Sequence, residues 1–109
     1  MEHEHSLEGW DIGRFDAAGW VPWGSTGDAR AKVLGVADGF HVALVEAQAG
    51  YAGEPHVHEH PEFLYVVDGK LRNQGQEMAT GDGYAAEQGS SHTDFAAVTD
   101  ATYLSIFRL

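Results

Sequence analysis

The sequence predicts an all-β domain that folds as a sandwich or a barrel. Short apolar runs rich in β-branched and aromatic residues alternate with glycine and turn residues, and no stretch keeps a helical apolar period for three turns. The clearest runs cover residues 40–45, 63–67 and 101–107, and weaker ones cover 31–36 and 83–86. Many short strands at a spacing of about ten residues are typical of closed or stacked sheets.

Turn residues separate these runs. Three Asp-Gly pairs, a combination that favours hairpins, stand at Asp38–Gly39, Asp68–Gly69 and Asp82–Gly83. Residues 14–20 predict at most one helical turn, because Gly19 interrupts it. Residues 1–8 predict a flexible N-terminal arm, and His3 and His5 within it have no predicted function.

Length and composition restrict the function classes. The 109 residues predict one domain over 1–109, and 43% hydrophobic residues are enough for a packed core. The absence of cysteine excludes disulfides, thiolate metal sites and cysteine nucleophiles. A net charge of -11 disfavours nucleic acid as a partner. Without a signal segment or an apolar run long enough to span a membrane, we expect a cytoplasmic protein with no membrane partner.

Histidines are concentrated in one segment of the chain. Residues two apart in a strand share a face, so His56 and His58 can point together into a barrel. Pro61 interrupts the strand ladder and lets the chain bring Glu62 beside them. Two imidazoles and a carboxylate suit Fe(II), Mn, Ni or Zn. His92, which follows Gly-Ser-Ser at the start of the next hairpin, is the candidate fourth ligand.

The glycines around these residues match a known pattern. The first cupin signature is Gly, five residues, His-x-His, three residues, Glu, six residues, Gly; the chain reproduces it with Gly50, His56, His58, Glu62 and Gly69. The second signature is matched by Gly81, Gly89 and His92, with Glu87 in the usual proline position and Ala96 in the usual asparagine position. The chain therefore resembles the cupins over residues 30–109.

This resemblance implies a cupin double-stranded β-helix, which is a jelly-roll barrel. It also implies that one divalent metal, with Fe or Zn favoured over Mn or Ni, is bound by His56, His58, Glu62 and His92. No organic cofactor site is predicted. The segment from Trp20 to Gly24, followed by residues 32–34 and the His-x-His motif, is similar to the cupin domain of zinc-dependent anti-sigma factors and to the dihydroxyacetophenone dioxygenases.

Three further residues are candidates for acid–base chemistry: Tyr84, His60 and Glu87. We expect His60 to be an exposed turn residue and His41 to be a partly buried, hydrogen-bonded strand residue. Strand alternation counted from Glu62 places Tyr65 on the outer face, which argues against a catalytic role. The better candidates for the pocket wall flank His92, namely Tyr84 and Phe95.

Three functions remain open for such a site. The preferred one is a non-haem metal dioxygenase that acts on a small oxygenated organic substrate. A redox-silent metal would instead support a Lewis-acid isomerase, cyclase or lyase. The third is a non-catalytic sensor module. The sequence argues against this function, because it shows no N-terminal helical domain that could bind a partner.

The tryptophans suggest a homodimer. Three of them, Trp10, Trp20 and Trp23, occur within a short N-terminal stretch, and Trp20 and Trp23 could cover the pocket or be buried in a subunit contact.

Overall fold

The fold is all-β, as predicted. The computed structural model describes residues 3–4 and 7–109, and these contain thirteen strands and no helix. No described residue therefore belongs to a helix that could span a membrane. The strands are β1 (His3–Glu4), β2 (Ile12–Gly13), β3 (Val21–Pro22), β4 (Ala29–Ala37), β5 (Phe40–Ala47), β6 (His56–Val57), β7 (Glu62–Asp68), β8 (Lys70–Asn73), β9 (Gln76–Ala79), β10 (Gly83–Ala86), β11 (Ser91–His92), β12 (Phe95–Ala97) and β13 (Ala101–Arg108).

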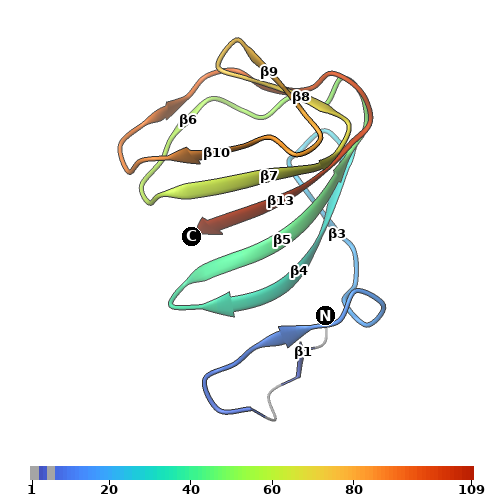
Figure 1. Ribbon diagram of the computed structural model, residues 1–109, viewed down its shortest axis with the longest axis vertical. Helices are drawn as coiled ribbons and strands as arrows, with labels where there is room; N and C mark the ends of the chain where they lie inside the picture. Colours follow the sequence, from blue (N-terminus) through green and yellow to red (C-terminus); the bar gives the residue numbers. More distant parts are fainter. Residues whose placement is uncertain (1–2, 5–6) are drawn as a thin grey trace.

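The strands form a jelly-roll barrel. The largest sheet has the order β10-β7-β13-β5-β4-β3, and its pairs are all antiparallel. A three-stranded sheet, β12-β8-β9, and a two-stranded sheet, β11-β6, complete the barrel. Figure 1 shows β6, β8 and β9 above the strands of the large sheet, with the N-terminal β1 below them and away from the barrel.

The barrel interior follows strand alternation. On β7, Leu64 and Val66 are 6% and 0% exposed, whereas Phe63 and Tyr65 are 43% and 50% exposed. The predicted outward position of Tyr65 is therefore confirmed. The largest fully buried side chains come from the two opposed sheets and are Tyr103, Leu71, Val45 and Val66.

Two of the three predicted Asp-Gly turns are confirmed. Asp38 and Gly39 both have positive φ (50° and 81°), the conformation of a tight hairpin turn, and they join β4 to β5. Gly69 also has positive φ (94°), and a Cβ there would lie 2.4 Å from the carbonyl oxygen of Asp100. Only glycine fits at this crossing between β7 and β8.

The third turn lies earlier than predicted. Gly81 has the positive φ (93°), and the Asp82 amide donates to the Ala79 carbonyl at 2.9 Å, whereas Gly83 is already in β10. Gly83 instead lets β10 approach β7 closely, because a Cβ there would lie 2.7 Å from the carbonyl oxygen of Leu64.

The N-terminal segment contains a turn and a small hairpin. In residues 14–20 the Ala18 amide donates to the Arg14 carbonyl at 2.9 Å, and no helix follows. Of the predicted arm over 1–8, residues 3–4 form β1, which pairs with β2. Residues 1–2 and 5–6, and with them His5, lie outside the described residues.

Candidate metal centre

Four side chains come together in the barrel, three from residues 56–62 and one from residue 92. His56 and His92 are paired across β6 and β11, His58 follows β6, and Glu62 is the first residue of β7. The three imidazole rings lie with centroids 4.8–5.3 Å apart. One ring nitrogen of each histidine lies within 4.8 Å of the others, so this group could hold a metal ion.

Backbone hydrogen bonds fix the segment that carries His58. The His58 amide donates to the Ser90 carbonyl at 2.9 Å, and the Gly89 amide donates to the His58 carbonyl at 2.7 Å. This pairing continues the β6–β11 ladder by one residue, after which the chain turns through Pro61. The loop before β11 is therefore attached to the His-x-His segment, and His92 is brought opposite His56.

Each histidine is oriented by a contact with its other ring nitrogen. His56 Nδ1 lies 2.9 Å from the Glu54 carbonyl oxygen, and His58 Nδ1 lies 2.9 Å from Ser90 Oγ. His92 Nε2 lies 2.7 Å from Asn73 Oδ1. Such outer contacts are the usual means by which proteins fix the direction of a metal-binding imidazole.

The remaining nitrogens of His58 and His92 face a carboxylate. His58 Nε2 and His92 Nδ1 are buried and have no hydrogen-bond partner. They lie 3.5 Å and 3.9 Å, respectively, from Glu62 Oε2. Buried polar atoms without partners are costly, and a cation placed among them would remove that cost. The donor set therefore fits a divalent metal ion.

Burial also keeps the His92 ring in the form that can bind a metal. Desolvation lowers the pKa of His92, and the nearby Glu62 opposes this effect only in part. A neutral imidazole has a free lone pair, whereas a protonated one does not.

Tyr84 contacts the carboxylate directly. Its hydroxyl donates to Glu62 Oε2 at 2.5 Å, and its ring lies edge-on to His92. Burial, followed by the charge of Glu62, raises the pKa of Tyr84. The phenol is therefore a hydrogen-bond donor at neutral pH. Tyr84 and Phe95 both line the cavity beside the centre, as predicted.

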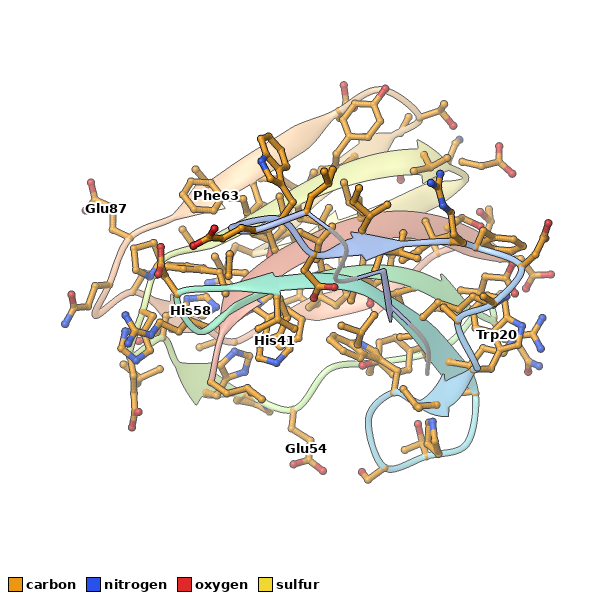
Figure 2. All side chains as sticks on the ribbon, turned by 90° about the horizontal axis from the view of Figure 1, so that it is seen from below. Trp20, His41, Glu54, His58, Phe63 and Glu87 are labelled. Atoms are coloured by element: carbon orange, nitrogen blue, oxygen red, sulfur yellow. The ribbon has the colours of Figure 1, made fainter. Side chains whose placement is uncertain are left out.

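The other two acid–base candidates lie further out. His60 is only partly exposed, so the expectation of an exposed residue is met in part, and it lines a surface hollow together with Glu62 and Arg108. Glu87 is exposed and its side chain points away from the barrel in Figure 2. Its backbone carbonyl accepts a hydrogen bond from Ser90 Oγ at 2.6 Å, and this holds the hydroxyl that contacts His58. Because only the backbone is used, glutamate can occupy the usual proline position.

Two spaces with shared wall residues adjoin the centre. A small cavity of about 90 Å³ inside the barrel is lined by His56, Glu62, Tyr84, His92 and Phe95 together with Trp23, Tyr51 and Tyr103. A wider groove of about 900 Å³ at the barrel mouth also contains His56 and Glu62, and its walls are mainly apolar. His56 is exposed, so the histidine cluster opens on this side.

The two tryptophans that flank Pro22 have different roles. Trp23 lines both spaces and packs edge-on against Phe107 at 5.3 Å, so it covers the pocket. Trp20 packs against Phe15 and the guanidinium of Arg30. It lies at the opposite end of the molecule from His58 in Figure 2 and is not a pocket residue.

The sequence alone indicates no specific role for the two residues that orient His58 and His92. Asn73 belongs to a polar set that could line a barrel, and Ser90 belongs to the loop before His92. Their contacts depend on strand register, which the local sequence does not reveal. His41 is partly buried and its ring is hydrogen-bonded, as expected.

Comparison with known proteins identifies the family. A family model described as the ChrR cupin-like domain matches residues 10–108. The chain belongs to the ChrR cupin-like family. No curated protein matches the sequence.

Solved structures of similar fold extend this result. A putative acetylacetone dioxygenase from Methylibium petroleiphilum is 21% identical, over 87% of this chain and 74% of that one, with a TM-score of 0.78. An acetylacetone dioxygenase from Acinetobacter johnsonii is 14% identical over 99% and 78%, with a TM-score of 0.75. The structure of Rhodobacter sphaeroides SigE in complex with the anti-sigma ChrR matches at 23% identity, over 86% and 51%, with a TM-score of 0.72. At these identities the likeness concerns the cupin fold.

Proposed function

We propose that this ChrR-like cupin is a metal-dependent dioxygenase that acts on a small oxygenated organic substrate. The metal is held by His56, His58, Glu62 and His92. The observation that carries the proposal is the pair of buried, partnerless nitrogens, His58 Nε2 and His92 Nδ1, which both face Glu62 Oε2. Three nitrogens and one carboxylate oxygen would hold a divalent metal with fewer protein ligands than an octahedral ion can take, which would let a substrate bind beside them.

The protein's own groups prepare this site. Glu54, Ser90 and Asn73 fix the three rings, so little reorganisation accompanies metal binding. The Tyr84 hydroxyl holds the carboxylate of Glu62 in place. Trp23 and Phe95 give the adjoining cavity apolar walls that keep bulk water away from a bound substrate.

A bound Fe(II) would supply the redox capacity that addition of oxygen to an organic substrate requires. The cavity of about 90 Å³ next to the centre has room for a small chelating group, such as a diketone, a catechol or an enediol. The two acetylacetone dioxygenases of similar fold support this choice of chemistry.

The test combines metal analysis with oxygen uptake. Protein produced without a His-tag is loaded with Fe(II) or Zn(II) and screened with diketones, catechols and enediols in an oxygen electrode. The proposal expects substrate-dependent oxygen consumption with iron and none with zinc. Isomerisation or elimination by the zinc or manganese form without oxygen uptake would instead identify a Lewis-acid isomerase, cyclase or lyase.

A metal-binding sensor module is a second candidate, favoured by the ChrR cupin-like match over residues 10–108. In that case metal binds tightly at the same residues, but no tested substrate is turned over by any metal form. Such a module would also change its partner affinity on metal removal, which a binding assay with metal-loaded and metal-free protein would detect.

A further inference from the structure

The groove at the barrel mouth contains a histidine that the proposed metal centre does not use. His41 occupies an inward position of β5, in the same row as the buried Ala43 and Val45. It lines the groove of about 900 Å³ together with His56 and Glu62. Figure 2 shows it between the large sheet and the loop that carries Glu54. It is therefore an interior residue at the open end of the barrel.

The His41 ring is fixed in orientation. It stacks on Phe107, with centroids 5.3 Å apart and planes 10° from parallel, and its Nδ1 lies 3.1 Å from the Gly39 carbonyl oxygen. A carbonyl oxygen only accepts, so Nδ1 carries the proton and Nε2 of the neutral ring is an acceptor. Among residues 7–109, no group forms a hydrogen bond with Nε2.

Strand register gives the position of His41 relative to the centre. His41 lies opposite Phe107, and the residue before Phe107, Ile106, lies opposite Phe63, the neighbour of Glu62. His41 and Glu62 thus occupy the same level of the barrel, two strands apart, which is roughly 10 Å between backbones. Phe107 lies between them and Trp23 packs against it, so the intervening surface is apolar.

We propose that His41 is a specificity-determining residue whose Nε2 accepts a hydrogen bond from a substrate hydroxyl. The substrate places its chelating oxygens at the metal centre, its apolar body over Phe107 and Trp23, and its hydroxyl at the far end against His41. This inference rests on the proposed function and adds a substrate class, namely hydroxyl-bearing chelators with an apolar body between the two polar ends.

The test uses three diketone probes with zinc-loaded protein, so that binding is measured without turnover. They are 1-phenylbutane-1,3-dione, its 4-hydroxyphenyl analogue and its 4-methoxyphenyl analogue, which lacks the donor. Titration calorimetry of the wild type should show the hydroxyl probe binding roughly three- to tenfold more tightly than the other two, the effect of one net hydrogen bond. In His41→Phe this preference should disappear. In His41→Gln, which keeps an acceptor, part of it should remain.

The outcomes separate the two proposals. Equal affinities of the three probes for the wild type, or an unchanged hydroxyl preference in both variants, would overturn the role of His41. If the phenyl probe still binds and loses affinity in His92→Ala, the metal proposal survives. A His41-dependent hydroxyl preference, with the same affinities in zinc-loaded and metal-free protein, would support His41 and contradict chelation. Failure of all probes to bind the zinc-loaded wild type would contradict both.

Discussion

At the scale of single residues, the metal centre is explained by desolvation. His58 and His92 are each 7% exposed, and each leaves one buried ring nitrogen without a partner. A buried nitrogen of this kind costs free energy in the empty protein. A metal ion offsets this cost, so the same burial that lowers the pKa of His92 prepares the ring for coordination.

Removing a ligand should remove the metal. We expect His56→Ala and His92→Ala to retain little or no metal after dialysis, because each loses one of the nitrogens that lie within 4.8 Å of each other. Elemental analysis of untagged protein measures this. His60→Ala is the matched control from the same segment, and it should keep the wild-type metal content. Equal metal in all three variants would contradict the assignment.

The residues that orient the proposed ligand side chains should also affect the affinity for zinc. Asn73→Ala and Ser90→Ala remove the contacts at 2.7 Å and 2.9 Å that orient His92 and His58. We expect each change to weaken zinc binding by about 10–100-fold. Competition with a chelating dye measures the affinity. Gln88→Ala, an exposed change in the same loop as Ser90, is the control and should bind zinc as the wild type does.

At the scale of elements, the β8–β9 hairpin is attached to the segment that follows His92. Both β8 and the loop after it contact the segment after His92: Arg72 of β8 pairs with Asp94 at 2.9 Å, and the Gly75 amide of the loop donates to Asp94 at 3.0 Å. The Gln74 side-chain oxygen accepts from the Thr93 amide at 2.7 Å. These contacts keep β8, and with it Asn73, in register with His92.

The stability that these Asp94 contacts contribute should depend on pH. The Arg72 side chain, and then the Gly75 amide, lower the pKa of Asp94 below its ordinary value of 3.8. A carboxylate with a lowered folded-state pKa contributes stability above the unfolded value and loses it as the pH falls through the folded value. Asp94→Ala should therefore lower the melting temperature modestly at pH 7, and the difference from the wild type should shrink below pH 3.8. Calorimetric scans from pH 7 to pH 3 test this, and a difference independent of pH would contradict it.

Strands could be predicted from the sequence where the pattern that indicates them lies within the strand itself. The runs predicted at 40–45, 63–67 and 101–107 lie in β5, β7 and β13, because β-branched and aromatic residues bounded by turn residues are a local signal within each strand. The hairpin turn at Gln74 and Gly75, both with positive φ, and the shifted turn at Gly81 were not predicted. Turn type depends on the register of the two strands it joins, and register is set across the sheet.

At the scale of the molecule, metal should stabilise the whole barrel. The proposed ligands come from β6, β7, β11 and the segment after β6, so metal binding would link the 56–62 segment to the distant β11. Free zinc at 100 times its dissociation constant should add about 2.7 kcal/mol to the free energy of unfolding. Melting curves with zinc and with EDTA measure the shift. The double variant His56→Ala/His92→Ala should melt at one temperature in both conditions.

The outer face of the large sheet is a candidate surface for the expected homodimer. Phe63, Tyr65 and Val67 form an exposed row on β7, each at least 43% exposed. We propose that two copies bury this row against each other. Light scattering should then give twice the single-chain mass of 11.8 kDa, and Tyr65→Glu should return it to one chain. A wild-type mass of one chain at micromolar concentration would contradict the dimer.

The sequence by itself determined the fold class and the four candidate ligands, because glycine spacing and the His-x-His pattern are properties of consecutive residues. The tertiary structure decided what surrounds them. Asn73, Ser90, Trp23 and His41 reach the site only through strand pairing and barrel closure. These contacts join residues far apart in the chain, and their register is fixed by packing across the whole barrel rather than by any local pattern.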